Sequence, residues 1–217
     1  MNLQKPLAEF LGTAMLAATV VGSGIMAQKL CGGNVGLALL CNTIATGTIL
    51  FVLIELLGPL SGAQFNPVVS LWLTLENKQS MTQTATFAIA QIAGGIIGAL
   101  LANAMFDLPL IQFSTTSRGG TGQWLAEVIA TFGLVLTIAG LSKTKPSAIS
   151  SAVALYITSA YFFTSSTSFA NPAVTIARLF SDTFAGISPT SVLPFILVQI
   201  IGAILAWRVS KILFQTN

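Results

Sequence analysis

Charged side chains are scarce in this sequence of 217 residues. Asp, Glu, Lys and Arg make up 7% of the residues, against roughly a quarter in an ordinary soluble domain, and 54% of the residues are hydrophobic. So few charges could not cover the surface of a water-soluble globule. The length accommodates about six membrane spans of roughly 20 residues each, with some residues left for connections. The composition therefore indicates one compact membrane domain over residues 1–217.

Histidine is absent and cysteine is rare, with only Cys31 and Cys41 in the sequence. Without histidine the chain cannot form a Ser–His pair or a His–Glu metal motif, and it has no paired Asp, so we expect it not to be an enzyme. The cysteines could in principle pair, but Cys41 falls in an apolar run and neither has a His or Cys neighbour at metal-ligand spacing. We interpret them as unpaired packing thiols and expect no catalytic residue, metal site or cofactor.

The nine basic residues are spread along the chain without a cluster, which argues against a nucleic-acid partner. They are better explained by orientation in the bilayer, because cytoplasmic loops carry an excess of Lys and Arg. If there are six spans and the N-terminus lies inside, the internal residues are Lys5, Lys78, Lys143, Lys145, Arg208 and Lys211, and the external ones are Lys29 and Arg118. We therefore predict a multi-pass protein of the cell (inner or plasma) membrane with both termini in the cytoplasm.

Six apolar stretches are long enough to cross a bilayer. They cover approximately residues 7–27, 35–57, 81–106, 124–141, 148–163 and 192–209. Two further segments, 61–76 and 164–183, begin with small polar residues, reach Asn-Pro and continue as largely apolar residues. Each is too apolar for an exposed loop and too short to span, so we predict two re-entrant half-helices. The fold class is an all-α membrane protein with six transmembrane helices and two half-helices.

An internal repeat supports this organisation. Three pairs of segments match in order and approximate spacing: 8–13 with 126–131, 65–70 with 170–175, and 90–95 with 198–203. Repeat 1 then covers residues 1–106 and repeat 2 covers residues 122–217, joined by an external connector over 107–121. Each repeat holds three spans, so the second lies upside down relative to the first. Permeation elements of such inverted repeats lie at the repeat interface near the middle of the membrane.

The two Asn-Pro pairs carry the chemistry. Proline suits the first turn of a helix and asparagine is a good N-cap, so Asn66-Pro67 and Asn171-Pro172 should each begin a half-helix. The residues just before them are expected to be extended, with carbonyls that line a wet cavity. The asparagine amides would point donors at the pore centre, where the partial positive charges of two helix N-termini oppose cations.

Glu9 and Glu127 occupy matching places in the first and fourth spans, where a carboxylate is expensive without partners. One reading is a proton relay. The other, which we favour, is that each accepts hydrogen bonds from the N–H groups of the re-entrant loops. We expect no other acid deep in a span, so a relay would have no next carrier.

Over essentially the whole chain, these residues resemble the major intrinsic protein family of aquaporins and glycerol facilitators. Residues 61–68 look like the first Asn-Pro-Ala loop of the family, with Val68 for alanine and Gln64 where histidine is usual. Residues 171–173, which end in Ala173, look like the second. The resemblance implies a homotetramer in the lipid bilayer with one pore per subunit and passive transport.

The departures from the family pattern concern its selectivity filter. Family members that conduct water or glycerol usually carry Arg after the second Asn-Pro-Ala, and here that residue is Val174. By the usual spacing, the resemblance places the other filter positions at Thr46, Ser159 and Ser168. It implies a wide, uncharged filter lined by hydroxyl groups. We therefore expect water to pass together with glycerol, urea-like polyols or metalloid hydroxides such as arsenite, as in bacterial relatives with a hydrophobic residue at this position.

Several alternatives stay open from sequence. Arg178 shares a helix face with Asn171 and Val174, so it looks into the outer vestibule or snorkels to the surface near Asp182. The channel could also be selective for water or leak ions through the filter that lacks Arg. A coupled secondary transporter would fit inverted repeats as well, but it needs a titratable or sodium site in the middle of the membrane.

Overall fold

The computed structural model describes residues 3–214, which contain eight α-helices and one 3-10 turn and no strand. Six helices are long and apolar enough to cross a membrane, the fifth of them together with the turn before it. They are α1 (Gln4–Leu30), α2 (Val35–Ser61), α4 (Met81–Met105), α5 (Thr121–Thr144), α6 (Ile149–Phe163, after η1, Pro146–Ala148) and α8 (Pro189–Leu213). The two others, α3 (Pro67–Leu75) and α7 (Pro172–Arg178), are too short to span. The predicted fold of six spans and two half-helices is confirmed.

Several spans extend by about one turn, at one or both ends, beyond the apolar stretches that predicted them. Helices α1, α5 and α8 continue past both ends of those stretches, and α2 continues through Pro59 to Ser61. Helical hydrogen bonds do not stop where apolar residues stop, so polar residues complete the last turns outside the hydrocarbon layer.

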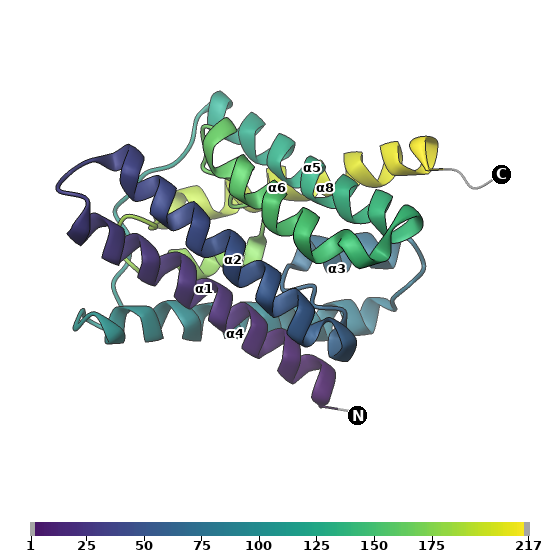
Figure 1. Cartoon of the computed structure of the whole chain (residues 1–217), viewed down its shortest axis with the longest axis horizontal. Coiled ribbons are helices and arrows are strands. Elements are labelled where there is room, and N and C mark those ends of the chain that lie inside the picture. The colour runs from purple at the N-terminus through teal and green to yellow at the C-terminus, as the bar shows by residue number, and fades with distance from the viewer. Residues whose placement is uncertain (1–2, 215–217) are drawn as a thin grey trace.

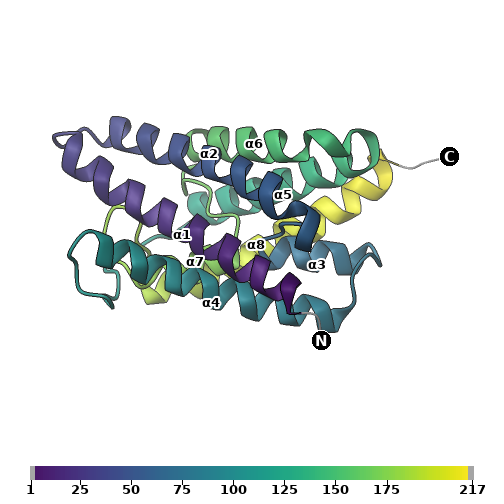
Figure 2. The same cartoon turned by 60° about the horizontal axis from the view of Figure 1, so that its bottom comes forward.

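The two halves of the chain pack alike. Helix α1 packs against α2 and α4, α5 packs against α6 and α8, and α2 and α6 join the halves. Figure 1 shows the long helices running along the longest axis, with the start of α1 and the end of α8 at the same end of the molecule. In Figure 2, α3 lies towards that end and α7 lies further along, between the long helices. The half-helices therefore enter the bundle from opposite ends.

Glycine lets the paired helices approach closely. A Cβ atom at Gly94 or Gly98 of α4 would collide with the backbone carbonyls of Phe10 and Ala14 of α1. Gly202 of α8 meets a carbonyl of α5 in the same way. Small residues at such crossings are typical of membrane helices, which associate by close backbone packing. The close α1–α4 and α5–α8 pairs therefore hold the helices in place around the interior of the bundle.

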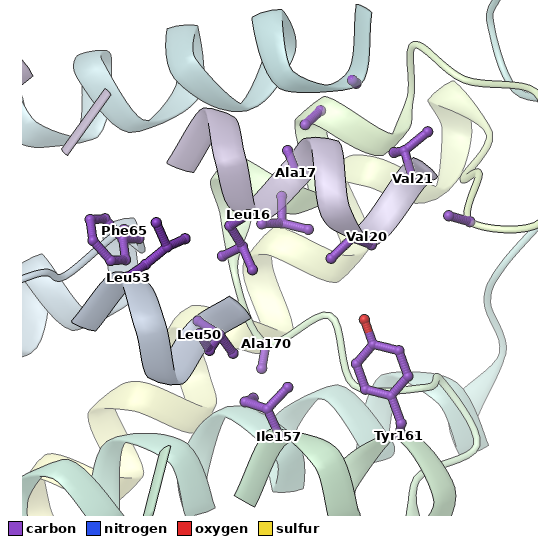
Figure 3. Packing of buried hydrophobic residues seen from close by; sticks show 14 of the residues in the cluster. Leu16, Ala17, Val20, Val21, Leu50, Leu53, Phe65, Ile157, Tyr161 and Ala170 are labelled. Atoms are coloured by element: carbon purple, nitrogen blue, oxygen red, sulfur yellow. The ribbon is translucent and has the colours of Figure 1, made fainter. Parts of the chain in front are cut away.

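Apolar side chains from both halves converge on that interior. Figure 3 shows Leu16 and Val20 of α1, Leu50 of α2 and Ile157 and Tyr161 of α6 pointing towards a common space. The hydroxyl group of the tyrosine is directed into this space. The side chains that these helices direct into the interior are therefore mostly apolar, with the Tyr161 hydroxyl as an exception.

One further acid lies in a span, near its end rather than deep within it. Glu55 lies within α2, about 9 Å from the C-terminal end of that helix at 1.5 Å per residue. Its side chain is exposed on the surface of the single chain and accepts a hydrogen bond from the Ser150 hydroxyl of α6.

Candidate functional site

Both half-helices begin at the proline of an Asn-Pro pair. Asn66 and Asn171 have extended backbones and precede the first helical residues, Pro67 and Pro172. The Asn66 side-chain oxygen accepts a hydrogen bond from the N–H of Val68 at 3.1 Å. The Asn171 oxygen accepts from the next two N–H groups of its own half-helix. These caps fix the orientation of both amides.

The two asparagines also link the repeats. The Asn66 Nδ2 donates to the carbonyl of Ala170, and the Asn171 Nδ2 donates to the carbonyl of Phe65, both at 2.8 Å. An amide NH₂ carries two hydrogens, so each asparagine keeps one donor beyond this cross-link. Both side chains line the central cavity. Two donors are therefore available where the half-helices meet.

The loops before the asparagines are not the extended chains that the sequence suggested. Ala63, Phe65, Thr167, Ser168 and Ala170 all have positive φ between 46° and 62°. This left-handed region costs roughly 1–3 kcal/mol for each non-glycine residue and persists only where surrounding contacts enforce it. The asparagines themselves are extended, because the residue directly before proline is forced into this geometry. The left-handed residues bend the loops sharply beside the cavity.

Glu9 holds the first loop in this strained shape. Its carboxylate accepts hydrogen bonds from the N–H groups of Gln64 (3.0 Å) and Phe65 (2.7 Å). It also accepts from the Ser61 hydroxyl at 2.5 Å and from the Gln91 amide at 2.8 Å. The side chain is fully buried. Four donors on one carboxylate provide the partners that a buried charge requires.

Glu127 does the same for the second loop. Its carboxylate accepts from the N–H groups of Phe169 (2.8 Å) and Ala170 (2.9 Å) and from the Gln199 amide (2.7 Å). The matching glutamines, at positions 91 and 199, belong to the third repeated segment and were not singled out from sequence. That repeat was the signal by which they could have been found.

One cavity runs past both loops and has a volume of about 790 Å³ with its open ends included. One wall comes from α1, α2, α5 and α6 and is apolar except for Thr46 and Tyr161, and the other is formed by the two loops, the two asparagines and residues of α3 and α7. Among the described residues that line it, none is acidic and only Arg178 is charged. Such a pathway offers most of its hydrogen-bonding groups along one side, which suits small solutes that pass in line.

The predicted filter is corrected at one position. Thr46, Ser168 and Val174 line the cavity, but Ser159 is exposed and donates to the carbonyl of Tyr156 at 2.8 Å. Tyr161 lines the cavity in its place. Each helical residue turns by about 100°, so an error of two residues in the family spacing moves a side chain to the opposite face. Ile157 and Val153, four and eight residues before the tyrosine on the same face, were the signal for the correct face.

The filter hydroxyls are linked. The Tyr161 hydroxyl lies 3.2 Å from Thr46 Oγ1, which itself donates to the carbonyl of Asn42. The threonine proton is thus in use, so the tyrosine is the donor. The Ser168 hydroxyl is buried and has no partner among the described residues. Val68, by contrast, packs in an apolar cluster with Trp72 and residues of α5 and α8, so its replacement of the usual alanine leaves the cavity lining unchanged.

Arg178 lines the outer part of the cavity and does not reach the surface. Its side chain is 2% exposed, its Nε donates to the carbonyl of Ala185, and its guanidinium lies 3.4 Å from the ring centroid of Phe169. Asp182 instead accepts hydrogen bonds from the N–H and hydroxyl of Thr115. Of the two placements left open by the sequence, the structure has the one in the vestibule.

A second arginine also lies near the Phe169 ring. Arg118 in the connector donates from Nε to the carbonyl of Gly186 at 2.8 Å, and its guanidinium lies 5.0 Å from the Phe169 centroid. Burial lowers the pKa of Arg118, and the Glu127 carboxylate acts in the opposite direction. An arginine nevertheless stays protonated at neutral pH. Two cations therefore lie around one aromatic ring at the end of the pathway that holds Arg178.

Comparisons with known proteins agree with this geometry. The family described as "Major intrinsic protein" matches residues 1–170. The chain is 50% identical over 209 residues to "Aquaglyceroporin AqpS" of Rhizobium meliloti (strain 1021), covering 96% of this chain and 89% of that protein. It is 33% identical over 142 residues to "Probable aquaporin NIP-type" of Nicotiana alata, covering 64% of this chain and 51% of that protein.

The fold has a solved counterpart. The X-ray structure of the aquaglyceroporin from Plasmodium falciparum superposes with a TM-score of 0.76 at 21% identity, covering 99% of this chain and 97% of that one. At this identity the likeness speaks for the fold alone. The two cross-linked half-helices, the cavity beside them and the family match over most of the chain lead to one conclusion. The chain belongs to the major intrinsic protein family, whose members are membrane channels and not enzymes.

Proposed function

We propose that this multi-pass membrane protein passively conducts water and small uncharged polyhydroxylated solutes, which include glycerol, urea-like compounds and metalloid hydroxides such as arsenite. The observation that carries the proposal is the filter, which has hydroxyl groups on Thr46, Tyr161 and Ser168 and an apolar side chain at Val174. Hydroxyl groups both donate and accept, so they can replace the water around a solute that has several hydroxyls. The 50% identity to a protein named an aquaglyceroporin supports this solute class.

The corrected filter narrows the prediction from sequence. Tyr161 is much larger than the serine expected at this position, so the constriction is less wide than two small hydroxyl residues would make it. Its hydroxyl remains part of the lining through the contact with Thr46. We therefore retain the preference for hydroxylated solutes and drop the argument from width alone.

Cations are opposed without an arginine at Val174. The half-helices place their partially positive N-termini at the asparagines, and Arg178 adds a full charge further out. No acid on the cavity lining balances them. The arrangement favours a neutral-solute channel over the alternative of an ion-conducting variant.

Stopped-flow light scattering on proteoliposomes tests the proposal. Gradients of glycerol, urea and arsenite should each dissipate faster than in empty liposomes, with linear dependence on concentration. Water permeation with exclusion of all three solutes would establish the alternative, a water-selective channel. Saturable flux that follows a proton or sodium gradient would instead indicate a coupled transporter, and conductance in planar bilayers would reveal an ion leak.

We also propose a homotetramer in the inner or plasma membrane with both termini in the cytoplasm. The number four comes from the family resemblance. An exposed polar stripe on α2, formed by Cys41, Thr48 and Glu55 at seven-residue spacing, supports self-association. Seven residues make almost two turns, so these groups lie in one line. A carboxylate facing lipid is expensive, so another copy of the chain is its best cover.

The orientation rests on the basic residues. The end of the molecule at which α1 begins and α8 ends (Figure 1) is the end that the positive-inside rule assigns to the cytoplasm. Native mass spectrometry of the detergent-solubilised protein should show four copies. A fully active monomer would contradict the assembly, and protease accessibility of tagged termini from the outside would contradict the orientation.

A further inference from the structure

The outer vestibule contains a buried positive charge that no acid neutralises. Arg178 is 2% exposed, and among residues 3–214 no carboxylate forms an ion pair with it. The nearby acids are committed elsewhere, Glu127 to the second loop and Asp182 to Thr115. A buried guanidinium without a counter-charge is costly, so it calls for an anionic partner.

The guanidinium is also held in a fixed orientation with donors to spare. Its Nε donates to the carbonyl of Ala185, and its face lies on Phe169, whose ring in turn packs edge-on against Phe195 at 5.2 Å. No described residue accepts a hydrogen bond from either terminal nitrogen. A planar guanidinium fixed in this way presents a fork of N–H donors, which matches two oxygens of an oxyanion.

Two further groups complete the site. The Ser168 hydroxyl lines the same cavity, is 2% exposed and has no partner in the described part of the chain. It can donate to an anion beside the arginine. Arg118 adds its charge near the Phe169 ring, held by the Gly186 carbonyl. Both cations thus contact the Phe169 ring, the unpartnered hydroxyl belongs to the residue just before it, and no described residue of the cavity lining is acidic.

We propose that Arg178 and Ser168 form a binding site for a small oxyanion in the outer vestibule, with Arg118 strengthening it by charge alone. The ligand is a free ion of phosphate size rather than a lipid headgroup, because Arg178 is buried within the protein and faces the aqueous cavity. The site does not depend on which neutral solute the channel prefers. An ion bound there would share the path of neutral solutes and slow them.

Binding is measured by the thermal unfolding of the purified protein in lipid-free detergent, which needs no transport. The midpoint Tm is compared in 50 mM sodium phosphate and in sodium chloride of equal ionic strength. For a Kd on the order of 5 mM, phosphate should raise Tm by roughly 3–5 °C. Phosphate also stabilises proteins non-specifically through exclusion from their surface, so the difference between variants is decisive.

Arg178→Met keeps the length and the packing on Phe169 but removes the charge, and it should lose most of the phosphate-specific rise. Arg208→Met is the matched control, since Arg208 also stacks on an aromatic ring, that of Trp207 at 5.2 Å, but on the exposed end of α8. It should keep the full rise. Equal rises in wild type and Arg178→Met would overturn the site.

Two milder variants cover the case in which Arg178→Met does not fold. Arg178→Lys keeps the positive charge but lacks the forked N–H donors of the guanidinium, and Ser168→Ala removes the unpartnered hydroxyl. Each variant should show a smaller phosphate-specific rise in Tm than the wild type. If both keep the full rise, the proposed site is wrong. Glycerol flux measured on the same preparations reports separately on the neutral-solute channel. The oxyanion site and the channel function can therefore be refuted independently of each other.

Discussion

Replacement of Glu127 by glutamine tests whether the buried acids hold the pore loops. The carboxylate accepts three hydrogen bonds, from the N–H groups of Phe169 and Ala170 and from the Gln199 amide. Glutamine has nearly the same shape but offers one oxygen acceptor and one NH₂ donor. In the Glu127→Gln variant the NH₂ group would face the Phe169 N–H alone if it took the place of Oε1, and both the Ala170 N–H and the Gln199 amide if it took the place of Oε2.

The magnitude depends on which orientation the new amide adopts. With its NH₂ group in place of Oε1, the Phe169 N–H is the one loop donor left without an acceptor. With its NH₂ group in place of Oε2, the Ala170 N–H is left instead, together with the Gln199 amide unless that amide rotates to present its Oε1, which has no partner in the described structure. A buried unsatisfied donor costs about 1–3 kcal/mol, so we expect a loss of about 1–3 kcal/mol in the free energy of unfolding if one donor is left unsatisfied and about 2–6 kcal/mol if two are.

The Glu127→Gln substitution should also displace Asn66, which belongs to the first repeat. Ala170 donates to Glu127 with its N–H and accepts from Asn66 with its carbonyl, so a displaced Ala170 moves the asparagine of the other repeat. Solute flux per folded channel should fall severalfold. A structural change this small in volume would not otherwise affect an asparagine of the first half-helix.

Equilibrium unfolding in mixed detergent micelles and stopped-flow flux give the two readouts. Asp182→Asn is the control, because this exposed acid also accepts hydrogen bonds from an N–H and a hydroxyl, yet water can replace them. It should change stability by less than about 1 kcal/mol. If Glu127→Gln matches wild type within about 0.5 kcal/mol with unchanged flux, the carboxylate does not support the loop.

Three further predictions follow from named contacts. Tyr161→Ala should raise glycerol flux relative to water flux by opening the constriction, whereas Ser159→Ala should leave the ratio unchanged because Ser159 faces away; an equal effect of both in stopped-flow assays would refute the corrected filter. Gly98→Leu should lower stability by more than about 2 kcal/mol because its side chain would meet the Ala14 carbonyl, while Gly58→Ala, which meets nothing within 4 Å, should be neutral or stabilising. In circular dichroism melts, similar Tm values for the two glycine variants would show that α1 and α4 do not need their close contact. Asn171→Ala should leave the Phe65 carbonyl without its donor and reduce flux of every solute, and a normal flux would show that the asparagine cross-link is dispensable.

Most of the fold could be predicted from the sequence, because a lipid bilayer permits few structures for an apolar segment. Apolar runs of about 16 residues or more can span, and the shorter ones that begin with Asn-Pro must turn back, so six spans and two half-helices followed from pattern and length. The repeat fixed the inverted arrangement, because an odd number of spans in each half reverses the second. Glu9 and Glu127 were recognised from matching places in the repeat before any partner was known.

The loops and the filter were less accessible to sequence. The rule for residues before proline predicts one extended residue, and it was carried too far into Ala63 and Thr167, which are left-handed. The loops that contain them are held by hydrogen bonds from their neighbours to two distant acids, Glu9 and Glu127. The prediction of the filter residue on α6 was wrong for a geometric reason. A two-residue error in spacing is small along the chain but rotates a helical side chain from the pore to the outer surface, which exchanged Tyr161 for Ser159.

By itself, the sequence determined the membrane fold, the paired asparagines, the loss of the filter arginine at Val174 and the buried acids, because each is written in local residue type and spacing. The tertiary structure alone decided which side chains meet in the pore. Arg178 lies in the vestibule rather than at the surface because Phe169 and the carbonyl of Ala185 hold it there. Those contacts join residues of the second loop, α7 and the segment after it, and no periodicity along one helix encodes them.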